Sequence, residues 1–124
     1  MVFLPWTTVD VRQGPAVVMA SEFRLSTARR VPAFLLDALR IRRQVLAADG
    51  ALGVALEARP FQRTFRTLSA WRDRAALDAF VRAEPHRRSM ARHRPAMAAS
   101  DFVFWTTDEL PVSWSDAVDR LHAA

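Results

Sequence analysis

The feature that most constrains this chain is the way its hydrophobic residues change their spacing along the sequence. Residues 16–25 alternate between two sets of side chains, one of them more apolar, and this period of two is typical of a strand. Residues 31–50 instead place apolar side chains three and four positions apart, with Pro32 near the start and Gly50 at the end. Both the spacing and the two flanking residues favour a helix.

The same change occurs again further along the chain. Residues 51–60 and 61–71 alternate and follow one another directly, so we expect them to form a hairpin. Residues 73–83 return to helical spacing, with Asp73 as the predicted N-cap, and residues 100–108 form the last predicted strand. The expected order is therefore strand, helix, strand, strand, helix, strand.

This order predicts an α+β fold, the ferredoxin-like βαββαβ plait, with residues 1–124 as a single domain. In that plait the first and third strands occupy the middle of a four-stranded antiparallel sheet, and both helices cover one face. The other face would be too apolar to contact water, so we expect a homodimer that seals it, as in a dimeric α/β barrel. Ser113 and Asp116 predict a capping box that opens a short terminal helix.

Composition excludes several classes of protein. The chain has no cysteine, which rules out disulfides, thiolate zinc sites and cysteine nucleophiles. Its net charge is +5, but all 18 basic residues are arginines spread along the chain, so we expect a solvated basic surface and no nucleic acid partner. The three glycines do not form a phosphate-binding loop. No segment approaches the roughly 20 apolar residues of a membrane span, and we expect a cytoplasmic location.

A basic segment, residues 84–94, contains the best candidates for chemistry. Pro85 can restart a helix, and His86, Met90 and His93 would then share one stripe of about 60° on that helix. The helix dipole disfavours a cationic ring in the first turn, and a base or metal ligand must be neutral. We therefore identify His86 as a candidate catalytic base or axial haem ligand.

Met90 and His93 are candidate substrate-binding residues on the same stripe. The two imidazoles would lie about 10 Å apart, too far for one ion, so we expect no dedicated metal site. The alternative is structural: His86 is a polar residue at a helix start, Met90 fills the core and His93 is partly exposed.

Two tryptophans on the predicted strands could line the space between sheet and helices. Trp71 would share a face with Phe65, Thr67 and Ser69, and Trp105 lies in the last strand. Large aromatic side chains with a few hydroxyls are typical of a small-molecule pocket. Trp71 is therefore a candidate catalytic residue and the other four are candidate substrate-binding residues. Alternatively, both tryptophans only fill the core.

A further set of charged residues lies on the predicted strands. Arg24, Arg66 and Glu57 could pair across the sheet as an ion cluster, which is the interpretation that we prefer. Arg66 is also a candidate substrate-binding residue, because an arginine can hold a substrate carboxylate or a haem propionate.

Residues 65–94 resemble the third strand and second helix of the antibiotic biosynthesis monooxygenase-like superfamily, whose members are dimeric α/β barrels. The resemblance rests on Trp71 at the end of a strand, on Ala76-Leu77-x-x-Phe80 in the following helix, and on the histidine at position 86. Residues 102–114 are similar to the final strand and tail of uncharacterised members. The resemblance covers about residues 16–121.

The resemblance implies a monooxygenase-like enzyme that acts on a hydrophobic small molecule, of aromatic, polyketide-like or isoprenoid type. Such an enzyme would be either cofactor-free or haem-dependent, with His86 as base or axial ligand. Haem-degrading members have an asparagine on the first strand, whereas this chain contains none. The alternative is a non-catalytic small-molecule-binding or structural dimer. A pocket of several hundred Å³ between Trp71, His86 and Trp105 would favour the enzyme.

Overall fold

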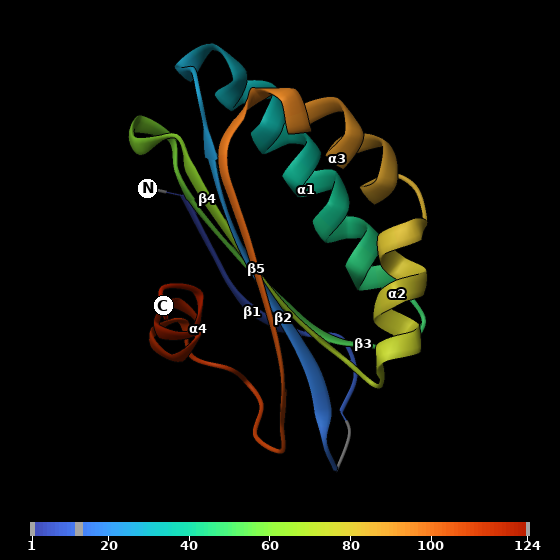
Figure 1. Cartoon of the computed structure of the whole chain (residues 1–124). Helices are drawn as coiled ribbons and strands as arrows, with labels where there is room; N and C mark the ends of the chain where they lie inside the picture. The colour runs from blue at the N-terminus through green and yellow to red at the C-terminus, as the bar shows by residue number, and fades with distance from the viewer. Residues whose placement is uncertain (1, 12–13, 124) are drawn as a thin grey trace.

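The computed structural model describes residues 2–11 and 14–123, and its described part contains one five-stranded antiparallel sheet (Figure 1). The strands lie in the order β1-β3-β4-β2-β5. The strands are β1 (Val2–Thr8), β2 (Ala16–Leu25), β3 (Ala51–Arg59), β4 (Thr64–Trp71) and β5 (Met97–Thr107). The main helices are α1 (Val31–Ala47), α2 (Arg74–Arg82), α3 (His86–His93) and α4 (Trp114–Leu121).

The predicted ferredoxin-like plait is confirmed. Its four strands correspond to β2, β3, β4 and β5, and β2 and β4 occupy the middle of that set, as expected. A fifth strand, β1, was not predicted; it pairs with β3 at the edge of the sheet, and its register shifts between Leu4 and Thr7. Pro5 breaks the strand pattern in the sequence, but an edge strand tolerates a residue without an amide hydrogen.

Local capping explains where the helices on one side of the sheet begin. Asp73 caps α2 as predicted, since its Oδ1 accepts a hydrogen bond of 2.8 Å from the backbone N–H of Ala76. The helical segment divides near Pro85, but Pro85 is the N-cap of α3 rather than its first residue. His86 therefore occupies the first position of α3. No helix within residues 2–11 and 14–123 is long and apolar enough to cross a bilayer.

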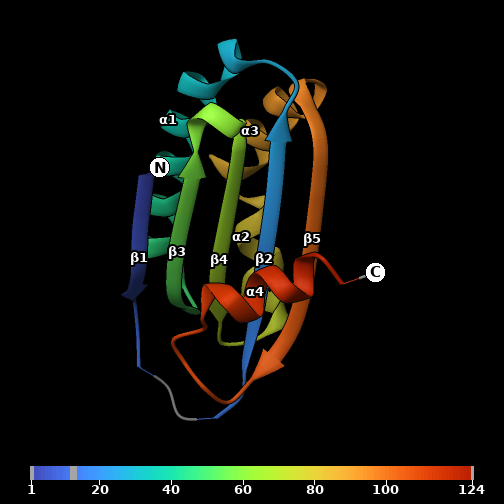
Figure 2. The ribbon, with the colours of Figure 1, turned by 90° about the vertical axis from the view of Figure 1, so that its left-hand side faces the viewer.

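The two faces of the sheet are covered by different helices (Figures 1 and 2). Helices α1, α2 and α3 cover one face, which we name the inner face. The terminal helix α4 lies across the other face, which we name the outer face, and it is seen in front of the strands in Figure 2. The predicted cap of α4 is confirmed, because the hydroxyl of Ser113 accepts a hydrogen bond of 3.1 Å from the N–H of Asp116.

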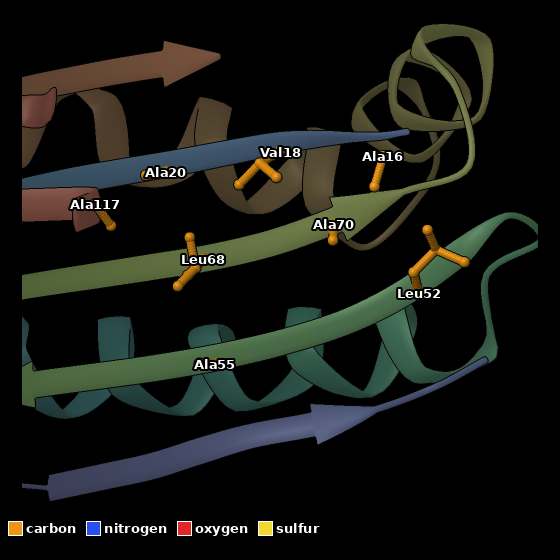
Figure 3. Close-up of a cluster of buried hydrophobic side chains, with 8 residues drawn as sticks. All are labelled: Ala16, Val18, Ala20, Leu52, Ala55, Leu68, Ala70 and Ala117. Atoms are coloured by element: carbon orange, nitrogen blue, oxygen red, sulfur yellow. The ribbon is translucent and has the colours of Figure 1, made fainter. Parts of the chain in front are cut away.

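Small side chains form the core on the outer face (Figure 3). Its buried members are Ala16, Val18, Ala20, Leu52, Ala55, Leu68, Ala70 and Ala117. Trp6, Trp105 and Trp114 pack against this cluster. The outer face is therefore not bare, contrary to expectation, because α4 lies across it and Trp6 of β1 packs against its core.

The contact between Trp6 and Gly53 gives a test of how β1 is docked. A Cβ added to Gly53 would lie 2.1 Å from Cζ2 of Trp6, so the ring would have to move. We expect Gly53→Ala to lower the free energy of unfolding by about 1–3 kcal/mol, measured by urea denaturation. In a Trp6→Ala background the same change should be neutral or stabilising. An equal loss in both backgrounds would contradict the described position of β1.

Candidate functional site

A cavity of about 60 Å³ lies between the inner face of the sheet and the helices. Its wall is mostly apolar and includes Met19, Phe23, Phe34, Ile41, Val54 and Phe102. Polar side chains reach it from both sides, namely Ser21, Thr67 and Ser69 from the sheet and Asp37, Arg42, His86 and His93 from the helices. An apolar wall with a few convergent polar groups is the usual composition of a small-molecule site.

The size of the cavity differs from the expectation. Each buried water needs roughly 10–15 Å³ of such space, so the cavity has room for about four. Pockets for drug-sized ligands span roughly 300–1,000 Å³. The cavity is therefore smaller than the pocket of several hundred Å³ that would favour the enzyme, and of Trp71, His86 and Trp105 only His86 lines it. A wider surface groove of about 840 Å³ between α1 and α2 brings none of the predicted site residues together.

His86 reaches the cavity from the first position of α3. Its Nδ1 lies 3.1 Å from the carbonyl oxygen of Val81, and because a carbonyl only accepts, Nδ1 carries the hydrogen. Its backbone N–H donates a 2.9 Å hydrogen bond to Oε1 of Gln44 on α1. Burial lowers the pKa of His86, and this effect outweighs the opposing hydrogen bond to Val81. The ring is thus held neutral, with the lone pair on Nε2 available to a bound molecule.

The hydroxyl groups of the sheet lie on the same side as His86. Ser21 and Thr67 are paired across β2 and β4 and share a hydrogen bond between their hydroxyls. Ser69 accepts a 2.9 Å hydrogen bond from Nε1 of Trp71. Trp71 itself is fully buried, with its ring centroid 4.8 Å from that of Phe80. Thr67 and Ser69 line the cavity, whereas Trp71 does not line it and is linked to it by its hydrogen bond to Ser69.

Of the remaining apolar candidates, Phe65 and Met90, only Met90 contacts the cavity. Met90 lies on α3 and lines the cavity. Phe65 is completely buried in a neighbouring cluster, with its ring centroid 4.5 Å from that of Phe34. Phe65 supports Phe34, which lines the cavity, rather than lining it directly.

His93 is buried and forms a hydrogen bond with Asp37 that the sequence interpretation missed. Its Nε2 lies 2.7 Å from Oδ2 of Asp37, which also accepts from Arg92 at 3.2 Å. Oδ1 of the same carboxylate accepts from Arg40 at 3.1 Å. Burial raises the pKa of Asp37, but the hydrogen bonds from His93 and Arg40 and the charge of Arg92 outweigh it, so the net shift is downward. Asp37 is therefore a carboxylate that orients His93.

The position of Asp37 could have indicated this pair. It lies between Phe34 and Ile41 on the apolar stripe of the predicted helix, where a carboxylate requires a partner. Arg42, one turn further along α1, was also missed; its Nη2 donates a 2.9 Å hydrogen bond to the hydroxyl of Thr7. Across the described residues, no group of three or more potential ligands is placed to hold a metal ion.

Trp105 lies on the opposite side of the sheet from the cavity. It pairs in register with Val18 and packs into the outer-face cluster, where the guanidinium of Arg120 lies 4.6 Å from its ring centroid. Side chains alternate along a strand, so Trp105 points outward while Phe102 points into the cavity. The expectation that Trp71 and Trp105 line one space is wrong for this reason.

Arg66 also lies on the outer face, within an ion cluster. Its Nε lies 2.6 Å from Glu22 and its Nη1 lies 3.4 Å from Glu57. Burial raises the pKa of Glu22, but hydrogen bonds from Arg66 and His122 outweigh this, and the net shift is downward. Arg66 and Glu57 thus pair across the sheet as expected, but the third member of the cluster is Glu22 and not Arg24. Since the sheet separates Arg66 from the cavity, Arg66 does not contact a molecule bound there.

The buried position of His86 generates a prediction about pH. We expect its ring to titrate below the ordinary value of 6.5, because burial disfavours the charged form. Between the folded pKa and 6.5 the unfolded chain binds more protons, so this residue makes the protein less stable as pH falls through that window. An NMR titration of the imidazole signals measures the pKa, and His86→Gln assigns them. Titration at or above 6.5 would contradict the neutral ring.

Comparison with known proteins relates this geometry to solved structures. No family model matches the chain, and no curated protein matches it in sequence. A candidate monooxygenase from Fusobacterium nucleatum superimposes with a TM-score of 0.76 at 10% identity, over 86% of this chain and 50% of that chain. The present chain thus spans about half the length of that protein.

Two other solved structures align with this chain over nearly the whole of their own length. A candidate antibiotic biosynthesis monooxygenase from Nitrosomonas europaea has a TM-score of 0.68 at 15% identity, over 83% of this chain and 99% of that one. A point mutant of SnoaB, a cofactor-independent oxygenase from Streptomyces nogalater, has a TM-score of 0.59 at 14% identity, over 78% and 98%. At the level of the fold, the chain is similar to the antibiotic biosynthesis monooxygenase-like ferredoxin-fold proteins, as its sequence predicted.

Proposed function

We propose that this chain is a cofactor-free oxygenase that acts on a small apolar molecule with an acidic C–H or phenol group. The observation that carries the proposal is the environment of His86, a neutral imidazole whose free Nε2 belongs to the wall of a mostly apolar cavity. A neutral imidazole is a suitable general base near pH 7. An apolar wall excludes water, which otherwise competes for the proton and quenches a carbanion.

The reaction requires only the substrate, dioxygen and a base. His86 Nε2 removes a proton from an activated CH₂ group, and the resulting carbanion transfers one electron to dioxygen. The two radicals then combine to a substrate peroxide. Loss of the second C–H proton and cleavage of the O–O bond give a carbonyl group and hydroxide, which the proton held by His86 converts to water. The balance is CH₂ + O₂ → C=O + H₂O, and no external reductant is needed.

The volume of the cavity limits the substrate. Four waters occupy about 120 Å³ in the liquid, and an engineered cavity of about 150 Å³ in another protein accepts benzene. By this comparison, the cavity measured here as about 60 Å³ has room for one aromatic ring. A larger polyketide-like or isoprenoid substrate would place its reacting ring in the cavity and extend beyond it.

Haem does not fit this site. A macrocycle needs a pocket of the roughly 300–1,000 Å³ class, several times the volume beside His86. Space beside the His86 ring is also occupied, since Phe80, which lines the same cavity, lies 4.9 Å from it between ring centroids. We therefore propose the cofactor-free version. The cofactor-independent oxygenase from Streptomyces nogalater supports this choice by analogy of fold.

A non-catalytic binding protein of the same fold is the second candidate. The small volume of the cavity favours it, as does the burial of Trp71 in packed core. Such a protein would bind the same class of small apolar molecule without consuming oxygen.

A homodimer in the cytoplasm is part of the proposal. With the outer face largely covered by α4, the support for a dimer is the edge strand β5, where Phe102 and Phe104 are 45% and 41% exposed. An unpaired strand edge with exposed aromatic side chains favours association with a second copy. Light scattering of the purified protein measures the mass directly.

Oxygen uptake tests the proposed reaction. Single-ring hydroquinones and 1-naphthol are incubated with protein in the presence of a chelator, and oxygen is followed with an electrode. We expect His86→Gln to reduce the protein-dependent rate by about 10²–10⁴-fold while binding is retained, because general-base catalysis contributes that much. The rate should also fall in acid as His86 becomes protonated.

His122→Gln is the matched control, since His122 is exposed and pairs with Glu22 on the outer face. Its oxygen uptake should equal that of the wild type. Binding of these compounds without any oxygen uptake would contradict the oxygenase and support the non-catalytic alternative.

A further inference from the structure

Two residues that line the cavity each carry a buried side-chain nitrogen atom without a partner. Among the described residues, Nε of Arg42 and Nδ1 of His93 are the buried side-chain atoms without a hydrogen bond. Both residues line the same cavity. A buried polar atom without a partner costs about 1–3 kcal/mol, so two such atoms on residues that line one cavity favour a ligand that satisfies them.

The hydrogen-bonding character of His93 follows from Asp37. The Asp37 carboxylate only accepts, so the hydrogen in the 2.7 Å contact belongs to Nε2 of His93. In the neutral ring Nδ1 then carries the lone pair and accepts. The imidazole is 1% exposed, and the edge-to-face contact with Phe34, at 5.1 Å between centroids, fixes the plane of the ring. An Asp–His pair of this kind sets both tautomer and orientation.

Arg42 supplies the complementary group. Its Nε–H is a donor, and its guanidinium is held in place by the 2.9 Å hydrogen bond from Nη2 to Thr7. The two unpartnered atoms therefore offer one acceptor, Nδ1 of His93, and one donor, Nε–H of Arg42. A hydroxyl group donates one hydrogen bond and accepts others, whereas a carboxylate, ether or carbonyl has no hydrogen to give to His93.

We propose that His93, oriented by Asp37, accepts a hydrogen bond from a phenolic or enolic hydroxyl of the molecule in the cavity, whose oxygen accepts from Arg42. His93 and Arg42 are then specificity-determining residues for a hydroxylated ring. This inference deepens the proposed function and rests on the same cavity. His86 and His93 are seven residues apart on one face of α3, about 10 Å along its axis, so the hydroxyl and the reacting carbon lie at opposite ends of the ligand.

The test compares phenol with fluorobenzene, two single-ring probes of similar shape, of which only phenol donates a hydrogen bond. Binding to the whole protein is measured by NMR titration. We expect phenol to bind about 10-fold more tightly, because fluorobenzene leaves Nδ1 of His93 without a partner.

His93→Gln is the decisive variant. The glutamine amide can still donate to Asp37, which preserves the fold, but it lacks an acceptor at the position of Nδ1. The affinity for phenol should fall to that for fluorobenzene, whose own affinity should not change. His122→Gln, on the outer face, should keep the 10-fold preference. If the wild type shows no preference, if the preference survives in His93→Gln, or if neither probe binds, the proposal is overturned.

A spectroscopic measurement separates this proposal from the oxygenase reaction. The ¹⁵N chemical shift of Nδ1 in His93 should be that of an unprotonated ring nitrogen, and it should move when phenol binds but not when fluorobenzene binds. A protonated Nδ1 in the free protein at pH 7 would overturn the proposed acceptor. Phenol preference that depends on His93 without oxygen uptake would sustain this inference and remove only the proposed catalysis. Oxygen uptake without a preference for phenol would overturn this inference and sustain the proposed catalysis.

Discussion

The register between β2 and β4 is the constraint on which the rest of the structure depends. These strands pair so that Ser21 lies opposite Thr67 and Glu22 lies opposite Arg66. Because side chains alternate across a sheet, the hydroxyl pair faces the helices and the ion pair faces α4. A slip of one residue would exchange the two faces, placing charges in the cavity and hydroxyls against α4. One set of backbone hydrogen bonds therefore keeps the Glu22–Arg66 ion pair and the Ser21–Thr67 hydroxyl pair on separate sides of the sheet.

On the inner side of the sheet, a small set of polar side chains lies within the mostly apolar wall of the cavity. Three of them are oriented by hydrogen bonds: His86 by the Val81 carbonyl and Ser69 by Trp71, both from outside the cavity, and His93 by Asp37, which also lines it. These supports lie in the core or on the helices, where packing restricts their rotamers. The sheet and helices thus present oriented hydrogen-bonding atoms to a space that excludes bulk water, an arrangement that both binding and catalysis require.

Periodicity sufficed to predict the plait, the order of its central strands and the Asp73 and Ser113 caps, because these depend on local spacing. The first strand was missed, since Pro5 obscures a pattern that only pairing with β3 completes. His86 and Met90 were placed correctly on one helix face for the same local reason. Trp105 was assigned to the wrong face because alternation fixes which residues share a face but not which face meets the helices. The partner of His93 lies 56 positions away, and that contact arises only from packing of α1 against α3.

Hydrogen bonds join α3 to α1 near both ends of the shorter helix. At the start of α3 the side chain of Gln44 accepts a hydrogen bond from the backbone N–H of His86. At the end of α3, His93 donates a hydrogen bond to Asp37. Gln44 also donates to the carbonyl of Phe80, so the end of α2 belongs to the same assembly. These hydrogen bonds therefore link α1, α2 and α3 into one layer over the sheet. His86 and His93 are held in a fixed relation to each other by the same layer, so a displacement of α1 would disturb both ring positions at once.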